Sequence, residues 1–471
     1  MKLHQGVATA VVTTAAISAI IVGAYLFGIL LFPSLTQRAL AGPLLRGESA
    51  AQGQASANRT ITSIVTVTRT IVTIGNAGCE GGDGSDKFVK EEFPAPNSNQ
   101  STSLGSVNVK NATRVGRTDR GFPLDGEQQR KVFAAHGLTW IFYSDGENLI
   151  YQTSENGSSW GDPINVTAQP KGFHFSIWYD PASNAVFYVN VDGYSCGFWF
   201  RWGTPDSNRR VAWGIKESFV PTDGQFDTNP YVYARGKNDV WVSFTSNGGD
   251  DIEVWRNNDS GWTRKLIVPT RLGSFSILLP LSSGIALVYG VGGYRLSNQN
   301  VTTTVDGGET WSAPVSTSER YFTQSAVSVA NSVYIVGLDE SLKLRFSSYT
   351  VGDSSFRNER VVATAVYRGA ISTNGASELE IVYADNYSIY YQSLSLSTGT
   401  WSSQKLLVTS PSPLPIHPSQ APYLITTNCN PLMIPYLIPS NELPVIWLFG
   451  DNPFVLMYSA ATLPPELHTA L

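Results

Sequence analysis

The chain has 471 residues, with 37 Asp and Glu against 32 Lys and Arg, and a formal net charge of -5. Charged residues make up only 15% of the sequence, whereas the 42 glycines, 26 prolines and 11% aromatic residues are abundant. This composition favours strands and turns over helices. The lack of basic runs argues against a protein that binds a nucleic-acid backbone. We therefore predict an all-β protein with no nucleic-acid partner.

The N-terminal region has the pattern of a membrane anchor. After a short tail, 1–6, residues 7–32 contain no charged side chain, and a bilayer core requires only about 20 apolar residues. We predict a transmembrane helix over 7–32, which would anchor the chain in a membrane as a single span. The small residues that end at Ala41 indicate an alternative, in which a leader is cleaved there and the protein is secreted. Sequons for N-glycosylation downstream place the bulk of the chain outside the cell.

Residues 33–104 have the composition of a flexible stalk, because they are rich in Ser, Thr and Gly and too polar to bury a core. The three cysteines, Cys79, Cys196 and Cys429, can form at most one disulfide within the chain. Cys79 lies in the stalk and is the candidate for a link between chains. No Cys and His cluster has the spacing of metal ligands, so neither a metal nor another cofactor is expected.

A unit of roughly 50 residues recurs between residues 105 and 460. Its most regular part, a hydrophobic strand followed by a tight turn of Asp, Asn or Gly, occurs seven times. Four antiparallel strands per unit are typical of a β-propeller blade, which buries both of its faces only by stacking against its neighbours. We predict seven four-stranded blades, or six if one unit is an additional hairpin, and a C-terminal tail at 461–471.

The last unit has only three recognisable strands. A complete propeller blade has four strands. We therefore predict that residues 106–115 supply the fourth strand of the last blade and close the ring.

Two turns share the pattern [ST]-x-[DE]-x-G-x-x-W. The matching residues are Thr153, Glu155, Gly157 and Trp160 in the first copy and Thr304, Asp306, Gly308 and Trp311 in the second. The pattern resembles the Asp box, or BNR repeat, of the sialidase-like propeller superfamily. The resemblance implies a structural turn in which a hydroxyl and a carboxylate bind backbone N–H groups and the tryptophan packs between blades.

A shared fold does not carry a reaction with it. Sialidases of the superfamily use an arginine cluster, a Tyr–Glu nucleophile pair and an Asp acid/base, and they carry an early [FY]-R-[IL]-P motif. The early segment from Arg117 to Pro123 departs from that motif. We therefore assign no catalytic residue and expect binding without catalysis.

Candidate binding residues fall into two groups. One group combines aromatic and basic residues in the long segment of the second unit, where sugar or protein recognition would use stacking and charge. The other consists of acids at the hairpin turns, which are predicted to share one face of the ring, although Asp also serves such turns by itself. The first group comprises Trp199, Arg201, Trp202, Arg209 and Arg210, and the second comprises Asp145, Asp192, Asp385 and Asp451.

These features predict a membrane-anchored extracellular propeller that binds surface glycans or a cell-surface protein. Two alternatives stay open. A glycoside hydrolase would need two carboxylates converging on the central pocket, and an architectural protein of an envelope or coat would need only an exposed, glycosylated surface.

Overall fold

The computed structural model describes residues 112–463 apart from several short segments, and these residues all belong to the compact unit Cys79–Leu471. The segments left out are 119–123, 125–128, 167–173, 192–195, 215–217, 223–227, 247–249, 271–274, 292–296, 411–413, 415–431, 439–441 and 450–453. The predicted membrane helix (7–32), the stalk (33–104) and Cys79 lie outside the described residues. Within the described ranges, no helix has the length and apolar character needed to cross a membrane.

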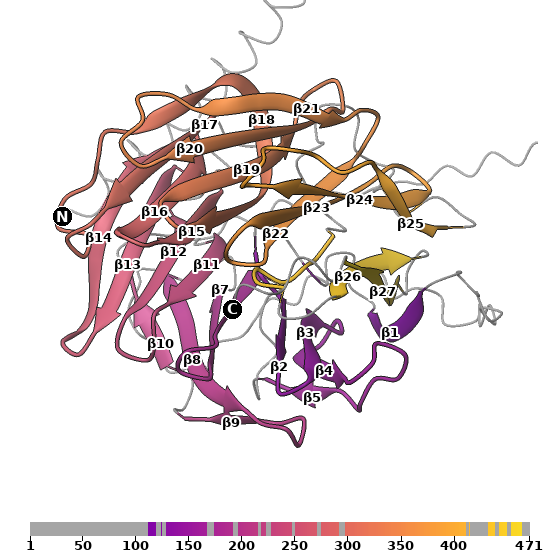
Figure 1. Cartoon of the computed structure of the whole chain (residues 1–471). Helices are drawn as coiled ribbons and strands as arrows, with labels where there is room; N and C mark the ends of the chain where they lie inside the picture. Colours follow the sequence, from indigo (N-terminus) through magenta and orange to yellow (C-terminus); the bar gives the residue numbers. More distant parts are fainter. Residues whose placement is uncertain are drawn as a thin grey trace, which may run out of the picture. The chain divides into compact units, whose positions relative to one another are not determined.

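The described strands form a seven-bladed propeller of antiparallel sheets (Figure 1). The first three blades follow one another along the chain. Blade 1 contains β2 (Val132–Ala135), β3 (Leu138–Ser144), β4 (Leu149–Ser154) and β5 (Ile164–Asn165). Blade 2 contains β6 (His174–Asp180), β7 (Ala185–Val191), β8 (Gly197–Pro205), β10 (Ser218–Pro221) and an additional short strand, β9 (Val211–Trp213). Blade 3 contains β11 (Thr228–Ala234), β12 (Val240–Ser246), β13 (Asp251–Asn258) and β14 (Gly261–Pro269).

Blades 4 and 5 share one long strand, β18 (Val315–Val329), which pairs with β17 through its first half and with β19 through its second. Blade 4 also contains β15 (Ser276–Leu281), β16 (Gly284–Gly290) and β17 (Ser297–Thr304). Blade 5 also contains β19 (Ser332–Leu338), β20 (Leu344–Thr350) and β21 (Arg357–Ala363). Blade 6 contains β22 (Arg368–Thr373), β23 (Glu378–Ala384), β24 (Ser388–Ser395) and β25 (Lys405–Thr409).

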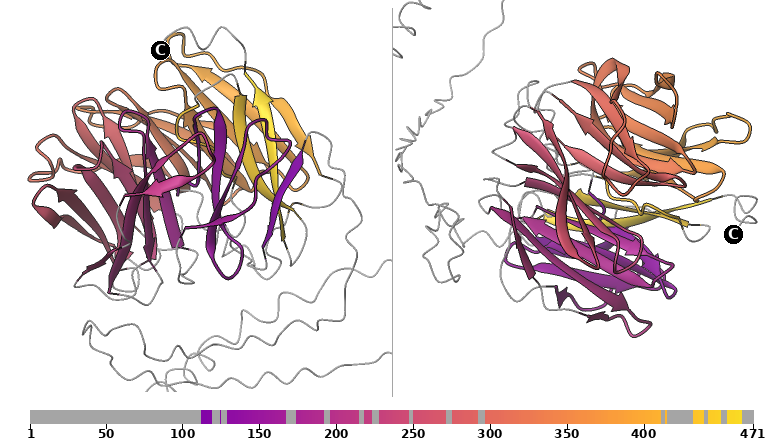
Figure 2. Two further views of the ribbon diagram at one scale, coloured as in Figure 1. Left: turned by 90° about the horizontal axis from the view of Figure 1, so that it is seen from below. Right: turned by 90° about the vertical axis from the view of Figure 1, so that its left-hand side faces the viewer.

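The last blade joins the two ends of the propeller. It contains β26 (Glu442–Phe449) and β27 (Phe454–Thr462), and Met433 bridges to Ile446 on its inner side. The N-terminal strand β1 (Thr113–Thr118) pairs antiparallel with β27 and completes the blade, and Figure 2 shows the indigo first strand beside the yellow last strands. The predicted closure is confirmed by the described strand, which overlaps the C-terminal end of the predicted segment 106–115, whereas residues 106–111 lie outside the described residues. The seven-bladed prediction is confirmed, and the six-bladed alternative is wrong.

Strands in the middle of a blade are buried on both faces, because each face packs against a neighbouring blade. All seven residues of β12 are buried, including the three polar ones. β-Branched and aromatic side chains suit such a surface, and they make up most of the inner strands. This packing explains why the second strand of each unit reads as a nearly continuous hydrophobic run rather than as an alternating one.

A tryptophan packs each of four blades against the blade before it. The residue lies just after the third strand of its own blade or at the start of the fourth, and its ring meets an aromatic ring of the preceding blade. Such pairs add about 0.5–1.5 kcal/mol beyond the area that they bury. The ring centroids are 5.4 Å apart for Trp160 and Tyr458, 5.1 Å for Trp262 and Phe200, 6.4 Å for Trp311 and Trp241, and 5.2 Å for Trp401 and Phe346.

The turn before Trp311 is held by a hydroxyl and a carboxylate. The Thr304 hydroxyl accepts a hydrogen bond from the Gly308 N–H (2.9 Å) and donates one to Asp306 Oδ1 (2.9 Å). Asp306 also accepts hydrogen bonds from the backbone and side chain of Thr310, which hold the pKa of this carboxyl below its ordinary value. Gly308 has a φ of 89°, a conformation that favours glycine.

In the turn before Trp160, the hydroxyl and the side-chain oxygen that accept backbone N–H groups belong to residues one position after those that match the motif. The Ser154 hydroxyl, rather than that of Thr153, accepts the Gly157 N–H (2.8 Å). Asn156, rather than Glu155, accepts the Ser158 N–H (2.9 Å). The Glu155 carboxylate sits on a longer side chain and instead pairs with Arg209.

Arg130, just before β2, connects blade 1 to blades 5 and 6. Its side chain is buried, and its two terminal nitrogens donate to the carbonyl oxygens of Ala326 in blade 5 (2.6 Å) and Ile371 in blade 6 (3.3 Å). The guanidinium carbon lies 5.4 Å from the ring centroid of Tyr436, next to the inner side of blade 7. The guanidinium group thus holds the inner strands together without an acidic partner among these contacts.

The interface between blades 6 and 7 buries a carboxyl group. Glu380 is only 1% exposed, and it shares one face of β23 with Val382 and Ala384, which pack in a cluster with residues of blade 7. Its pKa is raised to about 8, chiefly by burial and also by Glu378, although Ser393 and Lys405 act to lower it. At neutral pH the group is therefore mostly a neutral acid.

We expect the substitution Glu380→Gln to change how stability depends on pH. The native chain holds this proton up to about pH 8, whereas the unfolded chain releases it near the ordinary value of 4.5. The free energy of unfolding of the parent should therefore fall as pH rises through this window, by about 1.4 kcal/mol per unit at most. The glutamine variant should show a shallower fall in urea titrations at about pH 5, 6, 7 and 8. Glu147→Gln, at an exposed turn, is the control, and equal slopes in all three proteins would contradict the prediction.

Candidate functional site

The aromatic and basic residues predicted in blade 2 do not form one surface. Arg201 and Trp202 are neighbours on β8 and lie on opposite faces, as strand alternation requires. Arg201 donates to the Val166 carbonyl of blade 1 (2.6 Å) and stacks over Trp213 (4.4 Å). Trp202 packs on the opposite side against the main hydrophobic cluster, with Lys237 Nζ 4.1 Å from its ring centroid.

The other members of this group are also held in separate places. The Trp199 ring lies 5.0 Å from that of Phe219 on the neighbouring strand β10. Arg209 forms an ion pair with Glu155 (2.8 Å) and has a φ of 66°. Arg210 is exposed and uses its backbone N–H to bind Asp206 (2.9 Å). Trp199 and Arg201 are two residues apart on β8 and share a face, but Trp202 lies on the other face, so the five residues do not all meet at one place.

The predicted turn acids bind the backbone of their own hairpins. Asp145 Oδ1 accepts the N–H groups of Glu147 (2.8 Å) and Asn148 (2.6 Å). Asp385 Oδ1 accepts those of Tyr387 (2.8 Å) and Ser388 (2.6 Å) in the same way. Each aspartate lies one position before the two-residue tip of its hairpin, where its side chain caps the turn. Asp192 and Asp451 lie outside the described residues.

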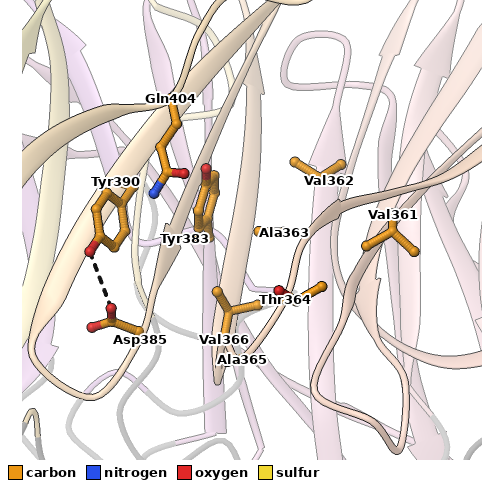
Figure 3. Close-up of a pocket in the computed structure, with 10 residues that line it drawn as sticks. All are labelled: Val361, Val362, Ala363, Thr364, Ala365, Val366, Tyr383, Asp385, Tyr390 and Gln404. Carbon is orange, nitrogen blue, oxygen red and sulfur yellow. Dashed lines mark hydrogen bonds between the residues drawn. The ribbon is translucent and has the colours of Figure 1, made fainter.

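Asp385 also reaches a cavity of about 470 Å³ between blades 5 and 6. Figure 3 shows this pocket and the side chains around it. Blade 5 supplies an apolar wall from the end of β21 and the loop after it, and blade 6 supplies the aromatic and polar groups. The lining residues are Val361, Val362, Ala363, Thr364, Ala365, Val366, Tyr383, Asp385, Tyr390 and Gln404. We call this cavity the interblade pocket.

Two tyrosines form the blade 6 side of the interblade pocket. Tyr383 on β23 and Tyr390 on β24 are cross-strand partners, and their rings are stacked with centroids 5.8 Å apart. Tyr383 is 1% exposed, and its hydroxyl has no hydrogen-bond partner among the described residues. Burial raises the pKa of Tyr383 to about 12, and Tyr390 adds to the rise. Next to the pocket there is thus a neutral, buried phenol hydroxyl with no hydrogen-bond partner among the described residues.

The polar groups of the pocket lie at its two ends. Asp385 Oδ2 accepts a hydrogen bond from the Tyr390 hydroxyl (3.2 Å), which orients the carboxylate. The amide of Gln404 lies beyond the tyrosine rings at the opposite end (Figure 3). A ligand between them would meet a carboxylate, a phenol and an amide, with aromatic and aliphatic surface around it. This is the usual make-up of a small-molecule site, which is mostly apolar with a few placed polar groups.

Sequence reasoning identified Asp385 and missed Tyr383, Tyr390 and Gln404. A usable signal was present for the tyrosines, because a two-residue tip at Asn386 and Tyr387 places Tyr383 opposite Tyr390 in the hairpin. The apolar wall from blade 5 and the position of Gln404 depend on packing between strands that are distant in the sequence.

Comparison with known proteins supports the fold and leaves the activity open. No protein-family model and no curated protein matches the chain. Among solved structures, a polysaccharide lyase described as a PL25 ulvan lyase has 11% identity and a TM-score of 0.50, covering 77% of this chain and 100% of that one. The polysaccharide lyase Uly1 has 10% identity and a TM-score of 0.46, covering 76% and 100%. The Hadza microbial sialidase Hz136 has 11% identity and a TM-score of 0.41, covering 59% and 66%. The chain therefore shares its β-propeller fold with an enzyme that acts on a polysaccharide.

Proposed function

We propose that this protein is a membrane-anchored extracellular propeller that binds a glycan in the interblade pocket without catalysis. The observation that carries the proposal is the Tyr383 side chain, which lines the cavity and whose buried hydroxyl has no partner among the described residues. A buried polar group without a hydrogen bond costs about 1–3 kcal/mol. A bound ligand with hydroxyl groups would remove that cost.

The surroundings of this hydroxyl suit a sugar. A pyranose ring has faces made of C–H groups and an edge made of hydroxyls. The half-buried ring of Tyr390, which stacks on Tyr383, and the wall at 361–366 offer apolar surface to the faces. Asp385 and Gln404 offer hydrogen-bond partners to the edge. The fold shared with an ulvan lyase agrees with a polysaccharide as the source of the ligand.

The acids of the pocket favour binding over hydrolysis. Glycoside hydrolysis ordinarily uses two carboxyl groups about 5–5.5 Å or 6.5–9.5 Å apart. Asp385 is the single carboxylate among the described lining residues, and one of its oxygens is occupied by the turn. Glycoside hydrolysis and an architectural role remain the competing functions, and each predicts a different experimental result.

We further propose that residues 7–32 anchor the chain and that the propeller lies outside the cell. The uncharged run and the sequons support this placement. Cys196 is disulfide-bonded, and its partner lies outside the described residues. Structural disulfides persist in oxidising compartments, which agrees with an extracellular propeller. The link between chains through Cys79 stays a prediction.

We expect Tyr383→Phe to lower glycan affinity about tenfold, because one hydrogen bond of roughly 1.4 kcal/mol is lost. The free energy of unfolding should stay equal or rise, since the variant removes a buried hydroxyl that has no protein partner among the described residues. An immobilised glycan array would select the ligand, and titration calorimetry would measure affinity. Tyr391→Phe is the matched control, because Tyr391 is the next residue on β24 and its hydroxyl donates to the Thr462 carbonyl of blade 7 (3.3 Å).

Three results would contradict the proposal. Unchanged affinity in both Tyr383→Phe and Tyr390→Ala would place the glycan site elsewhere. Turnover of fluorogenic glycosides that is lost in Asp385→Asn would make the protein a glycoside hydrolase. Retention of no glycan, together with self-association of the full chain, would favour the architectural protein.

We expect the full-length chain to stay with membranes after a carbonate wash, and a chain that lacks residues 1–32 to be released. Intact-mass measurement of the membrane fraction should find the N-terminal residues still present. Protease added to intact cells should degrade the propeller. A soluble product that begins at Gly42 would instead support the cleaved leader, and protection from the protease would contradict the outside location.

A further inference from the structure

The charge of the interblade pocket comes from one side chain. Among its described lining residues, Asp385 is the single carboxylic acid, and no lysine, arginine or histidine is present. Two basic residues are next to lining residues in the sequence, Arg360 before Val361 and Lys405 after Gln404. The side chain of each contacts an aromatic ring. The Arg360 guanidinium lies 4.5 Å from the ring centroid of Trp401, and Lys405 Nζ lies 5.3 Å from that of Tyr391. The described pocket is therefore acidic.

Lys405 is kept away from the pocket by the register of the sheet. It pairs directly with Tyr391 across β24 and β25, so the two share a face. Tyr391 belongs to the cluster that packs toward blade 7, whereas Tyr390 packs toward blade 5. The ammonium group of Lys405 thus lies on the opposite face of blade 6 from Asp385.

The carboxylate of Asp385 is also fixed in place. Oδ1 is held by two backbone N–H groups of its own turn, and Oδ2 is held by the Tyr390 hydroxyl. A fixed carboxylate cannot turn away from a second negative charge. A uronate or sulfate group in the pocket would face it without a counter-ion among the described lining residues, and like charges at short range repel strongly in a partly buried site.

We infer that the interblade pocket selects an uncharged pyranose and rejects acidic sugars, with Asp385 as the residue that sets this selectivity. The inference rests on the proposed function. Neutral sugar hydroxyls can donate to the Asp385 carboxylate, and the Gln404 amide can both donate and accept at the other end. The tyrosine rings and the aliphatic wall accommodate the C–H faces without any charge.

The inference is tested with sugars that differ only in the oxidation state of C6. Methyl glucoside and methyl galactoside are compared with the corresponding methyl glucuronide and methyl galacturonide. We expect the intact chain to bind the preferred neutral sugar at least about tenfold more tightly than its uronate. Raising the salt concentration from about 0.05 M to about 0.5 M should lower this ratio of affinities, because screening weakens the repulsion and the uronate then binds more tightly.

Asp385→Asn is the decisive variant, because asparagine keeps an oxygen for the turn and removes the charge. In this variant the affinities for the neutral sugar and its uronate should differ by no more than about threefold, chiefly because the uronate binds more tightly. Asp145→Asn makes the same change in the corresponding turn of blade 1, outside the pocket, and should leave the ratio unchanged.

The outcomes separate this inference from the proposed function. Equal or tighter binding of the uronate by the parent chain, or an unchanged ratio in Asp385→Asn, would overturn the inference and leave glycan binding intact. Binding of neither sugar class, or affinity for both that is unchanged in Tyr383→Phe and in Tyr390→Ala, would overturn the proposed function itself.

Discussion

The contact between a tryptophan of one blade and an aromatic ring of the preceding blade is the interaction on which this propeller depends. A single blade has two apolar faces and no other means of covering both, so it is stable only between two neighbours. The four ring pairs, from Trp160 with Tyr458 around to Trp401 with Phe346, occur at equivalent places in their blades. The turns that carry two of these tryptophans are held by hydroxyl and side-chain oxygens, and Arg130 adds bonds between inner strands.

The interblade pocket lies at one of these boundaries. Trp401 packs on Phe346 and is covered by Arg360, the residue before the wall at 361–366. The same contacts that fix blade 6 against blade 5 therefore fix the two walls of the pocket relative to each other. A preorganised pocket of this kind loses little conformational freedom when a ligand binds. The two described walls of the pocket are therefore held in position before any ligand binds.

Much of the architecture could be predicted from the sequence, because it depends on local patterns. The repeat of strand and turn identifies the blades, and the incomplete last unit indicates closure by the N-terminal strand. The Asp385 turn was also recognisable from its residues. The pocket was not, because its blade 5 wall and Gln404 meet the tyrosines only through packing between blades. The blade 2 segment misled for a related reason: Arg201 and Trp202 are adjacent in sequence, yet strand alternation sends them to opposite faces.

Closure by β1 also determines how the propeller would respond to mechanical force. Everything N-terminal to Thr113 is attached to the outer strand of blade 7, so tension along that part of the chain is applied to the ladder between β1 and β27. The strands are antiparallel and paired over most of β1, and the Thr113 hydroxyl also binds the Gly157 carbonyl of blade 1. A load at this point is therefore divided between the last blade and the first. Pulling on this part of the chain would strain the joint between the first and last blades, whereas the walls between blades 5 and 6 lie on other strands and would keep their spacing.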